Sequence, residues 1–207
     1  MNYDFIEVGT SDFDTLIQDA TDQCIGLCIE PIKFYLDRLP NKPNVKKINS
    51  AISFDGKVGR DKVYYIPLET IQKHNMPLWI RGCNSIGDYH YQHKKNNLQS
   101  VVETIDVDTI PLGDIFEQHN VDTLTILKID TEGYEFEVLI GAKDVLSGIS
   151  IVLFEHHYDD MIKKSYKYAD INELLKFNGF VQIYKSKMPF RKTFEYIFLN
   201  QKYMNRL

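Results

Sequence analysis

The stretch FIEVGTSDFDTLIQDATDQCIGLCIEP, residues 5–31, decides the fold. Its apolar runs at residues 5–9 and 24–29 predict two buried strands, and residues 15–23 between them have the spacing of an amphipathic helix. Gly9 ends the first strand, and Pro31 ends the second because it disfavours a helical conformation at Glu30. A strand, a helix and a second strand in this order predict a parallel βαβ unit.

The alternation of helices and strands continues beyond residue 31. Further helices are expected at residues 32–39, 112–119, 134–142 and 171–177. Further strands are expected at residues 45–54, 101–107, 124–129 and 149–154, followed by a pair at 181–184 and 196–199 joined by a loop that contains Pro189. This order predicts an α/β protein with a mostly parallel sheet covered by helices, and the chain of 207 residues is expected to form a single domain, residues 1–207.

The segment at about residues 56–100 interrupts this pattern. It begins with turn signals at Asp55-Gly56 and Gly59 and an exposed strand at residues 62–66. Residues 69–100 then lack the apolar periodicity that a core of their own would need. We therefore expect an inserted loop region, and Trp79 within it is interpreted as a packing residue.

The composition disfavours several classes of protein. With 24 Lys and Arg against 29 Asp and Glu, the net charge of -5 argues against nucleic acid as the partner, because phosphate backbones favour basic surfaces. The three cysteines are too few for a disulfide framework. No apolar run approaches the roughly 18–20 residues of a membrane span, and Asp4 and Glu7 interrupt the stretch where a signal peptide would lie. The sequence therefore predicts a cytoplasmic protein.

Polar residues follow the predicted strands at the edge where open α/β sheets bind their ligands. They are Glu7 and Gly9, Glu30, Asn49 and Ser50, Asp130 and Glu132, and Glu155 with His156 and His157. Gly9 lets the backbone approach a ligand closely, because it has no side chain to occupy that space. Carboxylates that precede a helix also cap its free N–H groups, so capping is an alternative role for Asp130 and Glu132.

The loop after the first strand disfavours a cofactor that carries phosphates. A dinucleotide-binding fingerprint needs three glycines, whereas residues 9–14 contain only Gly9 and have Asp12 and Asp14 where a pyrophosphate would lie. Glu30, about twenty residues further along, is suited to accept hydrogen bonds from a ribose diol. These residues favour a nucleoside without phosphates.

A longer motif, ILKIDTEGYE, lies at residues 126–135 and continues through Val138, Leu139, Gly141 and Ala142. It resembles the signature of the FkbM-type methyltransferases. Other parts of the family are similar, in the same order, to residues 5–15, Glu30-Pro31, residues 49–53, Asp55-Gly56 and residues 151–155. The resemblance covers about residues 4–158. Phe13 departs from the family, which often has a second glycine at that position.

The resemblance implies a Rossmann-like class I methyltransferase fold with a seven-stranded sheet whose last strand is antiparallel. It implies S-adenosylmethionine as the cofactor and a hydroxyl group as the methyl acceptor. Its site residues, carried over by position, are Glu7, Gly9, Thr10 and Ser11 for the methionine end, Glu30 and Pro31 for the ribose, Asn49, Ser50, Ala51 and Ile52 for the adenine, and Asp130 where cofactor and acceptor meet.

An alcohol acceptor loses a proton during methylation, so a base within hydrogen-bond reach is expected. Asp130 and His156 are the candidates, and Glu132 is expected to orient the acceptor. A satisfied core or surface histidine is the alternative for His156. A further alternative is a Mg²⁺ site built from Asp130, Glu155 and His156, although oxygen-rich magnesium sites rarely include histidine.

The leading interpretation is an O-methyltransferase that acts on a hydroxyl of a small molecule or carbohydrate. One alternative is a methyltransferase for nucleic-acid ribose or protein. Another is a cofactor-binding module without catalysis, which Phe13 in the cofactor loop favours. Cover for the acceptor is expected from the 56–100 insertion or from a second copy of the chain in a homo-oligomer.

Overall fold

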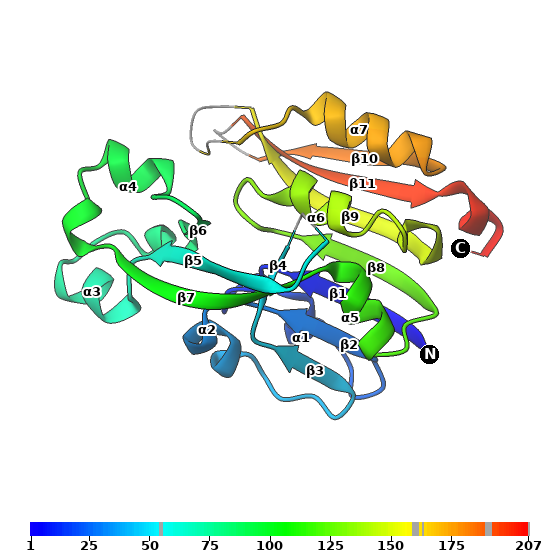
Figure 1. Ribbon diagram of the computed structural model, residues 1–207, viewed down its shortest axis with the longest axis horizontal. Helices are drawn as coiled ribbons and strands as arrows, with labels where there is room; N and C mark the ends of the chain where they lie inside the picture. The colour runs from blue at the N-terminus through cyan, green and yellow to red at the C-terminus, as the bar shows by residue number, and fades with distance from the viewer. Residues whose placement is uncertain (54–55, 159–161, 163, 189–191, 207) are drawn as a thin grey trace.

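A seven-stranded sheet forms the centre of the computed structural model, which describes residues 1–53, 56–158, 162, 164–188 and 192–206 (Figure 1). The strand order is β10-β11-β9-β8-β1-β2-β3. In chain order the strands are β1 (Asn2–Val8), β2 (Gly26–Ile29), β3 (Val45–Ile48), β8 (Thr123–Ile129), β9 (Ile149–His157), β10 (Phe180–Lys187) and β11 (Thr193–Asn200). The five strands β9, β8, β1, β2 and β3 pair in parallel with their neighbours in this order. Strand β11 runs antiparallel to both of its neighbours, β9 and β10. The expected sheet with an antiparallel last strand is confirmed, while Pro189 lies outside the described residues.

Helices pack on both faces of this sheet. On one face lie α1 (Leu16–Asp19) and α2 (Lys33–Arg38), and on the other lie α5 (Leu112–Gln118), α6 (Glu135–Gly141) and α7 (Tyr168–Phe177). Ile17 and Leu36 pack with Phe5 on the first face, whereas Leu139 and Ile171 belong to the larger core on the second. Helix α1 is shorter than the expected 15–23, because the polar residues 21–23 turn the chain back towards β2. Short 3₁₀ helices lie at Leu78–Gly82, Gln99–Val101, Leu146–Gly148 and Gln201–Arg206.

A second, smaller sheet accounts for the main difference from the expected strands. Its order is β4-β7-β5-β6, with β4 (Ala51–Ile52), β5 (Gly59–Tyr65), β6 (Ser85–Ile86) and β7 (Glu103–Ile110). The strand expected at 45–54 divides into β3, which stays in the main sheet, and β4, which pairs with β7. At the division, the Ser50 hydroxyl donates to the carbonyl of Asp108 at 2.8 Å and fixes the chain where it leaves the main sheet. Asp55, which formed part of an expected turn, lies outside the described residues.

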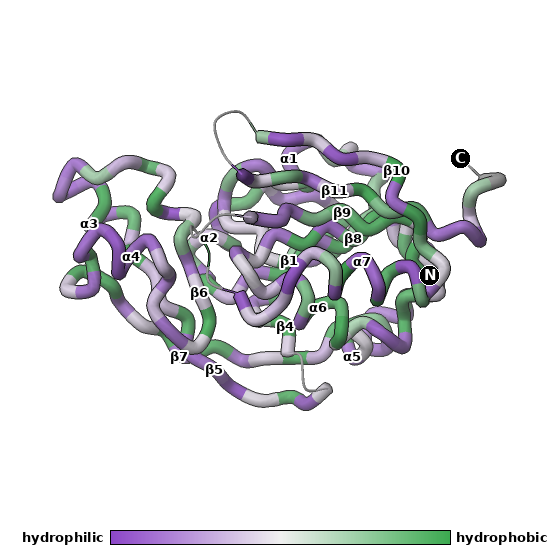
Figure 2. The backbone as a smooth tube through the Cα atoms, turned by 90° about the horizontal axis from the view of Figure 1, so that it is seen from above, coloured by the Kyte–Doolittle hydropathy of each residue, from purple (hydrophilic) through white to green (hydrophobic). Residues whose placement is uncertain are grey.

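The insertion occurs where it was expected, but it is more ordered than a loop region. It carries α3 (Leu68–Lys73) and α4 (Tyr91–Lys95), and Ile66, Ile71 and Ile80 form a small core of its own. Each of its elements is too short for a periodic pattern to be visible in the sequence. The insertion lies at the end of the molecule opposite both termini, and its helix α4 is hydrophilic (Figures 1 and 2).

Within the described residues, no helix is both long enough and apolar enough to cross a membrane.

Candidate functional site

A cavity of about 410 Å³ lies at the carboxyl ends of β1, β2, β8 and β9, with the insertion forming its opposite wall. Most of the residues expected to bind cofactor or acceptor line this cavity. They are Gly9, Thr10, Ser11, Glu30, Pro31, Ser50, Ala51, Ile52, Asp130 and Glu132. Residues 50 to 52 reach it because the chain crosses from the main sheet to the second sheet at this point. The structure therefore brings together side chains that are separated by more than a hundred positions in the sequence.

Gly9 brings the first loop against the end of β8. Its φ of +79° lies in the left-handed region, and a Cβ atom at this position would lie 2.1 Å from the backbone oxygen of Asp130. Any other residue would clash with the backbone of the neighbouring strand. The close approach places the loop at residues 9–14 directly beside Asp130.

Glu30 joins this loop to the turn after β2. One carboxylate oxygen accepts a hydrogen bond from the N–H of Ser11 at 2.8 Å, and the other accepts one from the N–H of Ile32 at 2.9 Å. Burial raises the pKa of Glu30 to about 7, although both N–H groups act in the opposite direction. Each oxygen retains a second lone pair, so Glu30 can still accept hydrogen bonds from a ligand.

Two residues expected to touch the cofactor do not line the cavity. Glu7 is fully buried, accepts a hydrogen bond from the N–H of Leu16 at 2.8 Å and forms an ion pair with Lys128 at 2.8 Å. Burial raises its pKa, and the charge of Lys128 partly offsets that effect. The side chain of Asn49 donates to the carbonyls of Glu30 and Pro31, at 2.9 and 2.8 Å. Both residues support the loops that line the cavity.

His156 lies on the opposite face of β9 from the cavity, so the structure does not bring it to the acceptor. Side chains alternate between the two faces of a strand, and on β9 Glu155 and His157 face the cavity. The His156 ring packs among aromatic rings, with its centroid 4.7 Å from that of Tyr158 and 5.9 Å from that of Tyr168. Burial lowers the pKa of His156 to about 4. Its alternative role as a core histidine fits this placement.

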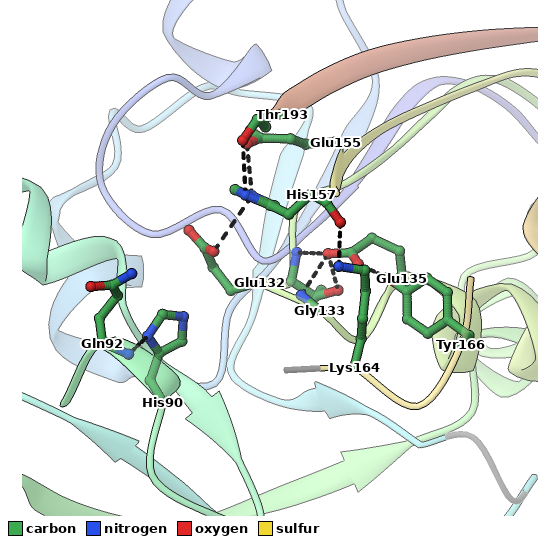
Figure 3. A network of polar contacts seen from close by, with 11 residues as sticks. His90, Gln92, Glu132, Gly133, Glu135, Glu155, His157, Lys164, Tyr166 and Thr193 are labelled. Carbon is green, nitrogen blue, oxygen red and sulfur yellow. Dashed lines mark hydrogen bonds and ion pairs between the residues drawn. The ribbon is translucent and has the colours of Figure 1, made fainter. Parts of the chain in front are cut away.

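His157 takes a place in the cavity that the sequence analysis did not assign to it (Figure 3). Its Nε2 lies 2.8 Å from Oε1 of Glu155 and 4.0 Å from Oε2 of Glu132, and its Nδ1 lies 2.9 Å from the hydroxyl oxygen of Thr193. Lys164 donates a hydrogen bond to the backbone oxygen of His157. The sequence signal was available, because counting by two from Glu155 along a strand that continues past Phe154 identifies His157.

Asp130 follows β8 and lies beside Glu155. The pairing of Ile129 with Phe154 puts the next residues of the two parallel strands at the same level, and both of them line the cavity. Burial raises the pKa of Asp130, and the charge of Glu155 raises it further, while Lys128 lowers it. Asp130 is thus a carboxyl group that holds its proton more tightly than an ordinary aspartate.

Glu135 fixes the loop between Asp130 and α6. One of its oxygens accepts hydrogen bonds from the N–H groups of Thr131 and Gly133, at 3.2 and 3.0 Å, and the other accepts one from the hydroxyl of Tyr166 (Figure 3). This carboxylate binds the N–H groups that precede α6, the task considered above for Asp130 and Glu132. Glu132 adopts a left-handed φ of 53° in this loop, and its side chain lines the cavity. Sequence analysis placed Glu135 in the motif without assigning it a role.

The cofactor loop accommodates Phe13 without a glycine at that position. Its left-handed conformations fall at Ser11 and Asp14, with φ of 49° and 55°. The ring of Phe13 lines the cavity beneath the guanidinium of Arg81, at 4.3 Å from the ring centroid. Arg81 also lies 3.6 Å from the carboxylate of Asp12, so the insertion is tied to the loop.

Trp79 lies at the mouth of the cavity with 44% of its surface exposed, as does Leu78 with 58%. Trp79 is therefore not fully packed, and part of its indole is accessible at the cavity. An exposed indole beside a cavity offers a flat apolar surface to a ligand.

The metal alternative gains no support from the site. The described residues contain no group of three or more His, Cys, Asp or Glu side chains arranged to hold a metal ion. Of the three ligands considered, Asp130 and Glu155 line the cavity and His156 does not.

The chain is similar to one protein family and to several solved structures. The family model described as the methyltransferase FkbM domain matches residues 7–181. Among solved structures, magnesium protoporphyrin IX methyltransferase from Synechocystis with bound S-adenosylmethionine is 10% identical, with a TM-score of 0.49, over 97% of this chain and 71% of that one. The N-methyltransferase NodS from Bradyrhizobium japonicum is 6% identical, with a TM-score of 0.44, over 96% of this chain and 85% of that one. The comparison with curated proteins finds no match.

Proposed function

The chain belongs to the FkbM methyltransferase family, and we propose that it transfers a methyl group from S-adenosylmethionine to a hydroxyl of an uncharged small molecule or carbohydrate. The observation that carries the proposal is a single cavity that joins the Gly9 loop, the Glu30 turn and Asp130. The first two suit a nucleoside, and Asp130 suits a hydroxyl acceptor beside it.

The lining of the cavity fits this cofactor. Gly9 leaves the loop backbone open to close approach, and Glu30 offers carboxylate oxygens to a ribose diol. Ala51 and Ile52 provide the apolar surface that an adenine ring needs. When bound, the cofactor supplies an electrophilic methyl group on a positively charged sulfur, and a cavity lined by carboxylates favours that charge.

The charges of the cavity support an uncharged acceptor. Its acidic lining residues are Asp14, Glu30, Asp130, Glu132 and Glu155. Arg81 also lines it, but its guanidinium lies beside Asp12 and over Phe13. A phosphate or carboxylate group on the acceptor would be repelled by those of these side chains that are ionised. This balance disfavours nucleic-acid ribose as the acceptor.

Methyl transfer to an alcohol depends on the position of the acceptor and on removal of its proton. Asp130 is the residue that would accept the proton of the acceptor hydroxyl, and the cofactor, when bound, would supply the methyl group that the acceptor oxygen takes up. Glu132, on the same loop, orients the acceptor through hydrogen bonds to it. Trp79 and Leu78 hold the apolar face of the acceptor at the mouth.

The cysteines support the proposal of a reducing, cytoplasmic location. Cys24 and Cys28 are free thiols. Burial raises the pKa of Cys28 to about 12, so its thiol stays protonated and unreactive.

The test has two stages, binding and turnover. Calorimetry with S-adenosylmethionine and S-adenosylhomocysteine first establishes binding, and methyl transfer is then measured with paired neutral and phosphorylated glycosides. The proposal expects binding of both cofactor forms and transfer to neutral acceptors only. Binding without transfer to any acceptor would instead support a module without catalysis, and transfer only to phosphorylated acceptors would overturn the charge argument.

A further inference from the structure

We propose that a hydrogen-bonded series of three side chains holds the carboxylate of Glu155 beside Asp130 and so strengthens Asp130 as the base for the acceptor hydroxyl. This hydrogen-bonded series consists of Thr193, His157 and Glu155, which act as positioning residues. The inference rests on the proposed function, because it explains how the same site removes the proton.

Three adjacent strands bring these groups together. Asp130 follows β8, while Glu155 and His157 lie on β9 and Thr193 begins β11. Thr193 pairs with His157 in the antiparallel register of β9 and β11, and Glu155 lies level with Asp130 across β8 and β9. The hydrogen-bonded series thus runs from Thr193 on β11 across β9 to the carboxyl group of Asp130.

The hydrogen bonds define the role of His157. Its Nε2 lies 2.8 Å from a carboxylate oxygen of Glu155, which can only accept, so Nε2 carries a hydrogen. Its Nδ1 then accepts from the hydroxyl of Thr193 at 2.9 Å, and Thr193 is fully buried. Both ring nitrogens are therefore occupied, and His157 orients Glu155 instead of taking the acceptor's proton itself.

The charge of Glu155 then acts on Asp130. Two neighbouring carboxylates resist simultaneous ionisation, so an ionised Glu155 makes Asp130 hold a proton more tightly. The raised pKa of Asp130, caused first by burial and next by Glu155, agrees with this effect. A base whose pKa lies nearer the working pH accepts a proton in the transition state more effectively. The hydroxyl proton moves to Asp130 as its oxygen–hydrogen bond breaks, and leaves to water after the product departs.

Other charges also face these groups and define the control. Asp130 faces Lys128 on its own strand, Glu135 on α6 and Glu7 on β1. Glu195 on β11 lies opposite Glu155 in register and lines a small cavity of about 30 Å³ with Asp130 and Glu155, outside the 410 Å³ cavity, but its charge is not among those that shift the pKa of Asp130. Around His157 lie Glu132, at 4.0 Å, and His90. Glu195→Gln therefore removes the same charge as Glu155→Gln, one strand farther from Asp130.

The test is a ¹³C NMR titration of aspartate carboxyl groups in the full chain, with the Asp130 signal assigned by its loss in Asp130→Asn. Glu155→Gln is expected to lower the titration midpoint of Asp130 by roughly one pH unit, whereas Glu195→Gln leaves it nearly unchanged. The acidic limb of the kcat/KM profile should move to lower pH by the same amount. An unchanged midpoint in Glu155→Gln would overturn the inference.

Thr193 provides a second, conservative pair of variants. Thr193→Val removes the hydroxyl but keeps the shape, and is expected to lower kcat several-fold with an unchanged KM, while Thr193→Ser restores the rate. Equal rates for Val and Ser would contradict the role of the hydroxyl. Because the NMR titration needs no turnover, a shifted midpoint in a protein that transfers no methyl group would refute the proposed function and leave the chain of positioning residues intact.

Discussion

The floor and the roof of the cavity are built in different ways. The floor consists of the carboxyl ends of parallel strands, and β2 is buried along its whole length. The roof consists of short pieces of the insertion, such as β6 with two residues and the 3₁₀ helix Leu78–Gly82 with five. Arg81 ties the two together through Asp12 and Phe13. From this difference we infer two roles: the floor holds the cofactor and the base, and the roof selects the acceptor.

Asp130→Asn should have the largest effect, because it removes the proposed base from the floor. We expect kcat to fall about 100-fold or more, as is typical for the loss of a general base. Calorimetry should show that affinity for S-adenosylmethionine changes only a few-fold, because Asn keeps the size of the side chain. A variant with normal turnover would remove Asp130 from the chemistry.

Gly9→Ala tests whether the floor depends on the close approach of the Gly9 backbone to Asp130. Gly87→Ala is the matched change in the insertion. Both glycines have a left-handed φ, of 79° and 78°, but a Cβ at Gly9 would clash with Asp130, whereas Gly87 has open space around it. We expect Gly9→Ala to abolish measurable cofactor binding and to lower the free energy of unfolding by about 3 kcal/mol or more. Gly87→Ala should lower it by about 1 kcal/mol and leave binding intact. Thermal denaturation and calorimetry measure both, and similar losses in the two variants would contradict the distinction.

Trp79→Ala tests the roof. We expect the KM for the acceptor to rise by roughly three- to tenfold, the range of a lost aromatic contact, while kcat and the affinity for cofactor stay constant. Phe177→Ala is the control, because Phe177 ends α7 outside the cavity and is 91% exposed. A change in cofactor affinity in Trp79→Ala, with no change in KM, would place Trp79 with the floor.

The last expected effect is a pH dependence of stability that comes from Glu30. Its pKa is raised from 4.5 to about 7 in the folded state, so its contribution is fully present below about pH 4.5 and is lost as the pH rises through 7. Chemical denaturation of the wild type should show the free energy of unfolding falling across this window by about 3 kcal/mol. Glu30→Gln should flatten that fall, and an identical pH profile in the variant would exclude Glu30 as its source.

The sequence located the floor well because parallel strands carry a clear pattern. The ends of strands at Gly9, Glu30 and Asp130 could be read directly, and the structure brings all three to one cavity. The sequence did not reveal which of the polar residues at these strand ends point into the cavity. Glu7 and Asn49 also lie near the ends of strands, but neither side chain points into the cavity. Glu7 forms an ion pair with Lys128, and Asn49 donates hydrogen bonds to the carbonyls of the Glu30 turn.

The alternation of side chains along β9 and the shortness of the elements in the insertion account for the other differences between the expected and the observed structure. The strand at 149–154 continues to His157, so the alternation puts His157 rather than His156 in the cavity. The roof has no period to read, because its elements have two to eight residues and gain their order from contacts such as Ile66 with Ile71 and Ile80. The exposure of Trp79 depends on those contacts and is not visible in the sequence.

A crystal structure with S-adenosylhomocysteine tests the central claim most directly. We expect the ribose within hydrogen-bond distance of the Glu30 carboxylate, and the sulfur facing Asp130 across the space beneath Trp79. A ligand bound elsewhere, or a cavity filled by the Phe13 ring with Glu30 directed away from the ribose, would contradict it.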